Sequence, residues 1–178
     1  MPDVIFHTLQ EYPTLPPIQE TGRTLAANSL IKATFVFKMT GLPSLADDSG
    51  LFIDALDGRP GVLSSRYGGD DEHRIRRVLH ELEEAKKRTA AFRAAFTYYD
   101  QAGAYRIFEG ECRGSITRAS RGRHGFGYDP IFIPRGYTKT FAELGPTIKN
   151  RISHRAKALR EFKKFFTKKT PPSPLPLP

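Results

Sequence analysis

The sequence predicts an α/β domain in which helices flank a mixed β-sheet. Residues 71–88 repeat apolar side chains at helical spacing and begin with aspartate, as helices often do. Residues 90–99 alternate apolar side chains with a period of two, and a turn at 100–103 leads to a returning strand at 105–111. Helices combined with a hairpin and isolated strands are typical of a mixed sheet.

The N-terminal part predicts further elements in order. Residues 3–8 have the composition of a short strand, and the prolines after them favour a loop. A helix is expected to begin at a cap on Thr24 and to end at Gly41. Two short strands are expected next, at 44–47 and 51–56.

The C-terminal part continues the pattern after the hairpin. A strand at 114–117 leads into a basic loop at 119–124, and a strand interrupted by glycine is expected at 126–133. The last helix is expected over 150–166, capped by its first asparagine. Residues 167–178 are rich in proline and are expected to form a disordered tail.

Length and composition fit one domain, expected over residues 1–166, whose sheet can divide into two lobes. The single cysteine, Cys112, excludes an internal disulfide and fits a reducing compartment. No apolar run reaches the length of a membrane span, and the first residues lack the pattern of a signal peptide. We therefore expect a cytoplasmic protein without membrane contact.

The net charge of +9 indicates contact with a polyanion, either a nucleic acid or a small ligand such as a triphosphate. Much of the excess lies in residues 149–169, where it can equally be the solvated face of a helix. Charge therefore does not choose between these functions.

Three short motifs can carry chemistry, and the first is Ala46-Asp47-Asp48-Ser49-Gly50. Adjacent carboxylates on a strand point to opposite faces, so one of them can face a given cleft. Mg²⁺ binds one or two carboxylates and completes its shell with water and phosphate oxygens. The alternative for so short a motif is a polar turn with no ligand.

The second motif, Gly125-Phe126-Gly127-Tyr128-Asp129, combines two aromatic rings with a hydrogen-bond acceptor. Flat rings between glycines can receive a nucleobase, and a carboxylate can accept from its ring N–H. The alternative is a tight turn whose rings belong to the core.

The third motif places Lys149 and Asn150 before Ser153-His154-Arg155 at an expected helix start. Free backbone N–H groups and cationic side chains there form a site rich in donors. The alternative is a helix whose basic residues face water.

In this order the motifs resemble the inosine triphosphate pyrophosphatase family, whose members are also called XTP/dITP diphosphatases. The resemblance covers residues 18–166. The matching segments are 20–22, Asn28, 32–33, 48–51, 54–56, 58–62, 65–67, 125–132, 139–144, Lys149 and 153–155.

The resemblance implies a mixed α/β fold with two lobes around a nucleotide-binding cleft, assembled as a homodimer. It implies Mg²⁺-dependent hydrolysis of ITP, dITP and XTP to the monophosphate and pyrophosphate. Asp48 would bind the metal and activate water, and Glu20 would be a second metal ligand. Lys32 and Ser49 would lie at the phosphates.

The resemblance also implies a pocket that recognises the purine. The implied contacts to the base are Phe126, Gly127, Tyr128, Asp129, Lys149, His154 and Arg155. Donors in such a pocket would pair with the 6-oxo group of hypoxanthine or xanthine. They would face the 6-amino group of adenine unpaired, which is how buried polar sites reject analogues.

The chain departs from the family in two places. Its first residues correspond to the family's second element, so the strand and turn that grip the triphosphate are expected to be missing. Ala27 stands where the family carries glutamate. These departures predict weak activity and reduced stability, as in an impaired nucleotide-binding homologue. A basic nucleic-acid-binding domain is the other alternative, which the motifs disfavour.

Overall fold

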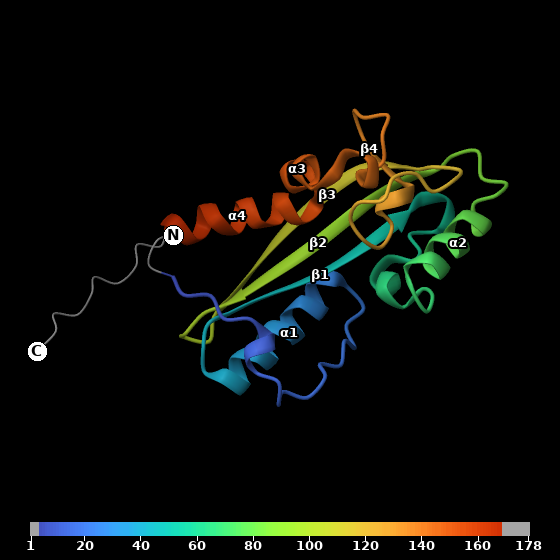
Figure 1. Cartoon of the computed structure of the whole chain (residues 1–178). Helices are drawn as coiled ribbons and strands as arrows, with labels where there is room; N and C mark the ends of the chain where they lie inside the picture. Colours follow the sequence, from blue (N-terminus) through green and yellow to red (C-terminus); the bar gives the residue numbers. More distant parts are fainter. Residues whose placement is uncertain (1–3, 169–178) are drawn as a thin grey trace, which may run out of the picture.

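The computed structural model describes residues 4–168, which form a four-stranded sheet with helices on both faces (Figure 1). The sheet order is β1-β2-β3-β4, and its strands are Ser44–Ile53, Thr89–Tyr99, Tyr105–Ile116 and Phe132–Pro134. The α/β fold with flanking helices is confirmed. The three described pairings are all antiparallel, however, rather than mixed.

The described residues contain four α-helices, which pack around the sheet. They are α1 (Leu25–Thr40), α2 (Asp71–Glu81), α3 (Phe141–Ile152) and α4 (His154–Lys168). Helix α1 lies on one face of β1 and β2, where Ser29 bonds to Thr97 at 2.7 Å. Helix α4 packs on the other face, where Phe162 meets Phe96 and its neighbours (Figure 1). None of the described helices is long and apolar enough to cross a membrane.

Helix α1 begins and ends where the sequence predicts. The hydroxyl of Thr24 accepts a hydrogen bond from the backbone N–H of Ala27 at 3.1 Å. Gly41 adopts the left-handed conformation with φ of 70°, a backbone shape that costs glycine little. Both signals act within one helical turn, so they set the ends of α1 without help from the elements that pack against it.

Several expected boundaries in the N-terminal half are wrong. Residues 4–8 form no strand, because nothing in the described chain pairs with them, and Ile5 and Phe6 are 83% and 68% exposed. The expected strands at 44–47 and 51–56 are one strand, β1, which runs to Ile53 before a short 3-10 turn. Its polar residues alternate between two faces and therefore need no turn.

Boundaries in the C-terminal half also differ. The strands expected at 105–111 and 114–117 are one strand, β3, and α2 ends at Glu81 rather than near residue 88. Most of 126–133 is turn and 3-10 helix, and only its last two residues enter β4. The helix expected from residue 150 is two helices that break at Ser153.

Helix α3, which no sequence prediction covers before residue 150, starts at a capping box formed by Thr140 and Glu143. The expected tail at 167–178 overlaps α4 in its first two residues, and the rest lies outside the described residues.

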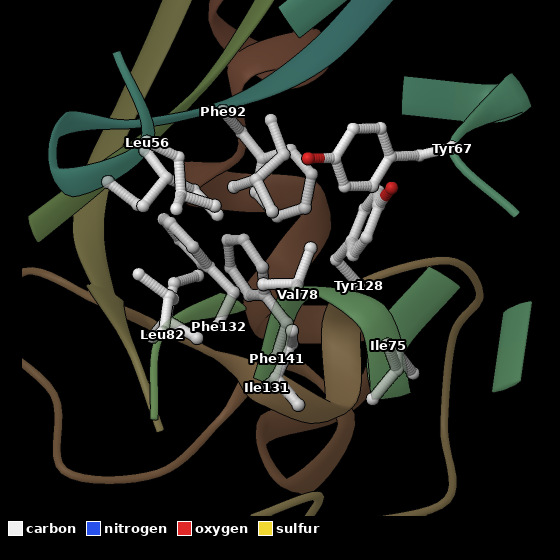
Figure 2. Close-up of a cluster of buried hydrophobic side chains, with 14 of the residues drawn as sticks. Leu56, Tyr67, Ile75, Val78, Leu82, Phe92, Tyr128, Ile131, Phe132 and Phe141 are labelled. Atoms are coloured by element: carbon white, nitrogen blue, oxygen red, sulfur yellow. The ribbon is translucent and has the colours of Figure 1, made fainter. Parts of the chain in front are cut away.

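The main core joins α2 and α3 to one face of the sheet. Figure 2 shows side chains from α2, the strands and the start of α3 converging on Phe92 and Phe132. The rings of Phe92 and Phe132 meet edge to face, with centroids 4.7 Å apart. This packing fixes the ends of β1, α3 and α4, which carry most of the candidate site.

Candidate active site

Asp47 and Asp48 point to opposite faces of β1, as the pleat requires. Asp48 faces α1, where its Oδ1 accepts from Lys32 Nζ at 2.8 Å and its Oδ2 from Asn28 Nδ2 at 3.2 Å. Asp47 faces α4, where its Oδ2 accepts from Arg155 Nε at 2.9 Å. The structure therefore gives the two carboxylates different partners on different faces of the sheet.

Lys32 joins Asp48 to Glu20. Its Nζ lies 2.8 Å from Asp48 Oδ1 and 3.0 Å from Glu20 Oε1, and Arg66 Nη2 binds the other oxygen of Glu20. Burial alone would lower the pKa of Lys32, but its bonds to the two carboxylates outweigh burial and raise the pKa. Burial likewise raises the pKa of Glu20 less than Lys32 and Arg66 lower it. Lys32 and Glu20 are therefore both charged at neutral pH.

The same two carboxylates are the candidates for holding a metal. An ammonium group between them occupies the position of a cation, so the site already attracts positive charge. Within residues 4–168 there is no group of three or more His, Cys, Asp or Glu side chains that could hold a metal. Asp48 and Glu20 thus fit Mg²⁺, which needs few protein ligands when phosphate completes its shell, and do not fit a structural metal.

A second group of residues surrounds a small cavity on the α4 face. The cavity has a volume of about 120 Å³. Its lining includes Ser49, Phe126, Tyr128, Asp129, Lys149 and Arg155. The structure thus brings together residues from the turn at 125–129 and the two C-terminal helices, as the resemblance implies. Ser49 of β1, which was expected at the phosphates, lines this cavity instead and donates to Asp47 Oδ2 at 3.1 Å.

Asp129 anchors this cavity. It is 1% exposed, and its Oδ2 accepts from the backbone N–H of Phe126 at 3.0 Å and from Lys149 Nζ. Gly125 has φ of 83°, and an added Cβ there would collide with the Asp129 carboxylate. The turn is therefore built around this carboxylate.

The two aromatic rings of the turn have different environments. Phe126 is 60% exposed, and Lys149 Nζ lies 4.2 Å from its ring centroid. Tyr128 is buried among core residues beside Tyr67 (Figure 2), and its hydroxyl donates to the carbonyl of Ser64 at 2.9 Å. Burial raises the pKa of Tyr128. Only Phe126 offers an open face, whereas Tyr128 forms a wall.

His154 is a buried, neutral side chain at the start of α4. It is 3% exposed and stacks on Phe92 with centroids 4.8 Å apart. Burial, followed by the charges of Arg155 and Lys149, lowers the pKa of His154 to about 3. Its Nδ1 is buried and has no hydrogen-bond partner among residues 4–168, so it is free to meet a ligand.

The start of α4 differs from the prediction. Asn150 lies inside α3 and caps nothing, whereas Ser153 separates the helices and its Oγ accepts from the N–H of Ala156 at 3.2 Å. The expected donor-rich helix start is nevertheless present, three residues later. It places His154 and Arg155 together at the cavity.

The two groups of site residues lie on opposite faces of β1. One edge of β1 pairs with β2. On the other edge, the described contacts are a bridge between Phe52 and Pro60, a bond from Leu51 N–H to Ser64 Oγ, and a bond from Gly58 N–H to the carbonyl of Ile53. A ligand that reaches both groups therefore has to pass around this outer edge, beside Ser49.

Three contacts within the candidate site were not predicted from the sequence. Asn28 orients Asp48, and Arg66 orients Glu20. Asp71 Oδ2 accepts from the N–H of Gly127 at 2.6 Å and so holds the turn at 125–129 against α2. Asn28 and Arg66 lie within segments that resemble the family, but Asp71 carries only the signal of an acidic helix start.

The buried His154 predicts a pH-dependent stability. Between its ordinary pKa of 6.5 and its folded pKa of about 3, the unfolded chain binds a proton that the folded chain does not. The free energy of unfolding should therefore fall by about 1 kcal/mol per pH unit as pH drops through this window. Urea unfolding at several pH values measures this slope.

We expect His154→Phe, which keeps a ring stacked on Phe92, to have a flatter slope below pH 6.5. His80→Gln is the control, because that imidazole is 83% exposed and should leave the slope unchanged. Equal slopes for the wild type and His154→Phe would contradict the assignment.

Comparison with known proteins places these residues in a family context. The sequence model of the Ham1 family matches residues 2–165. The "dITP/XTP pyrophosphatase" of Halalkalibacterium halodurans is 45% identical over 163 residues, covering 89% of this chain and 84% of the relative. The protein of the same name from Geobacter sulfurreducens is 45% identical over 161 residues, covering 88% and 81%.

The fold of this chain is also similar to that of solved structures. A HAM1 protein from Coxiella burnetii is 45% identical with a TM-score of 0.83, covering 89% of this chain and 84% of that one. The Ham1 protein of Staphylococcus aureus is 33% identical with a TM-score of 0.85, covering 91% and 85%. The family match runs from residue 2 onward and does not support the expected loss of a preceding segment. The weak activity expected from that loss has no support either.

Proposed function

The chain belongs to the Ham1 family, and from this premise we propose that it hydrolyses dITP, ITP, dXTP and XTP to the monophosphate and pyrophosphate. The names of the relatives support this reaction. The observation that carries the proposal is the pairing of a charged Asp48–Lys32–Glu20 cluster with a donor-lined cavity across one strand. A nucleoside triphosphate has the matching shape, with phosphates at one end and a base at the other.

At the phosphate end, Asp48 and Glu20 would hold Mg²⁺. The bound ion would neutralise phosphate charge during hydrolysis. Asp48 orients the attacking water and accepts its proton, while Asn28 keeps the carboxylate in place. Lys32, released from its two carboxylates, donates to a phosphate oxygen.

At the base end, Lys149, His154 and Arg155 supply donors for the 6-oxo group. Asp129 accepts from a ring N–H, and the open ring of Phe126 stacks on the purine. Adenine presents an amino group where these residues need an acceptor, and leaving them unpaired disfavours it.

The cationic residues of the site argue against a general nucleic-acid-binding role. Lys149 is paired with Asp129, and Arg155 is paired with Asp47. A surface for sequence-independent binding of nucleic acid leaves its cations open to phosphates. The homodimer that the resemblance implies stays a prediction.

Pyrophosphate release from dITP tests the proposal, with dATP and dGTP as controls and with Mg²⁺ present or removed by EDTA. We expect turnover of dITP that exceeds that of dATP by about a hundredfold or more. We also expect EDTA to abolish it, because without the metal the charge of the phosphates is no longer neutralised beside Asp48 and Glu20. No release from dITP by the folded protein, or equal release from dATP, would overturn the proposal.

A further inference from the structure

Arg74 lines the base cavity from an element that the motifs do not include. It lies on α2, one turn after the start of the helix, and its side chain is only 19% exposed. Its Nη1 lies 3.0 Å from Asp71 Oδ1, and the other oxygen of Asp71 accepts from the N–H of Gly127. Asp71 therefore orients the guanidinium group and the turn of Phe126 together.

The hydrogen-bonding capacity of Arg74 is not used up by this pair. Its Nε is buried and has no hydrogen-bond partner in the part of the chain that the structure describes. A buried donor without a partner is costly, and such groups in native proteins often meet a ligand or water. Because Arg74 lines the cavity, a bound base is a candidate partner for this guanidinium.

The cavity thus has donors on two walls. Lys149 and Arg155 come from the C-terminal helices, and Arg74 comes from α2. Asp129 pairs with Lys149, and Asp47 pairs with Arg155. A base with an acceptor on one edge can accept hydrogen bonds from the donors of one wall only. A base with two oxo groups can accept from the donors of both walls.

Among purines this distinction falls on the substituent at C2. Xanthine carries an oxo group there, hypoxanthine carries hydrogen, and guanine carries an amino donor. An amino group that faces a guanidinium sets donor against donor, and the buried groups stay unpaired. The second donor wall thus favours xanthine and disfavours guanine, although both have the same 6-oxo group.

We propose that Arg74 is a specificity-determining residue that donates to the 2-oxo group of a xanthine base and disfavours the 2-amino group of guanine. This inference rests on the proposed function, because it assigns the second edge of the same base. Asp71 is its positioning residue.

Steady-state kinetics of Arg74→Gln with dXTP, dITP and dGTP tests the assignment. We expect kcat/KM for dXTP to fall about tenfold or more and that for dITP to fall less than about threefold. The ratio of dGTP to dITP turnover should rise. Arg76→Gln is the matched control, since Arg76 lies on the same helix, is 60% exposed and does not line the cavity. Equal losses on dXTP and dITP would mean that Arg74 only holds the turn, and would overturn the inference.

Binding of the monophosphates XMP, IMP and GMP by calorimetry separates this inference from the proposed function. Suppose that the wild type hydrolyses none of the nucleotides and yet binds XMP more tightly than GMP. If Arg74→Gln then loses that binding preference, the proposed function fails and the inference stands. If the wild type does not prefer XMP over GMP, the inference fails. Arg74→Lys, which keeps a donor and a charge, should retain part of the preference, and melting curves check that each variant is folded.

Discussion

We expect Asp48→Asn to reduce kcat for dITP by about a thousandfold while the protein stays folded. The substitution keeps the shape of the side chain and its bond partner Asn28 but removes the negative charge that binds Lys32. An amide cannot accept the proton of the attacking water, and it is a poorer ligand for Mg²⁺. Lys32 keeps Glu20 as a partner, so the loss of stability should be small.

The adjacent residue provides the contrast. Asp47 lies on the opposite face of β1, where it accepts from Arg155 and Ser49. Asp47→Asn should therefore raise KM, through a less ordered Arg155, and change kcat by less than about tenfold. Equal losses of kcat in the two variants would contradict the assignment of Asp48 to the catalytic step and of Asp47 to substrate binding.

A methyl group added at Gly110 should cost about 2 kcal/mol or more of stability. Gly110 lies on β3 directly beneath the start of α4, and an added Cβ would lie 2.7 Å from the N–H nitrogen of Ala158 and closer still to the carbonyl of His154. These are backbone atoms of a packed helix, which cannot rotate away as a side chain can. Gly110→Ala therefore has to push α4 off the sheet.

Thermal and urea unfolding measure this effect, and the melting temperature should fall by several degrees. The activity should fall as well, because α4 carries His154 and Arg155 into the cavity. Gly69→Ala is the control, since an added Cβ there meets no atom within 4 Å. A melting temperature unchanged by Gly110→Ala would contradict the close packing of α4 on β3.

The agreement between sequence and structure is best where a signal acts over a few residues. Thr24 and Gly41 bound α1 as predicted, because a cap satisfies backbone groups within one turn of its own helix. Asp47 and Asp48 oppose each other because the pleat alternates side chains with a period of two. The cap signals need no distant part of the chain, whereas β1 still needs its partner strand β2.

Long-range contacts explain the failures. Residues 4–8 have strand composition but lack a neighbouring strand in the described chain, and a strand needs a partner for its backbone groups. Asn150 has the chemistry of a cap, yet Ser153 separates the helices because α3 already begins at the capping box of Thr140. Local composition allows a helix to start at several residues, and tertiary packing selects one of these positions.

The candidate site divides in the same way. The residue types of its motifs were enough to predict a pair of carboxylates, an aromatic turn and a group of donors, because each chemistry requires particular side chains. The place of Glu20 beside Asp48 was implied only by the family resemblance. Three features were not predictable: Lys32 bridges two carboxylates, Tyr128 is buried, and Arg74 lines the cavity. The first two of these features join residues that are 12 to 64 positions apart in sequence, and only the packing of sheet and helices sets which residues meet.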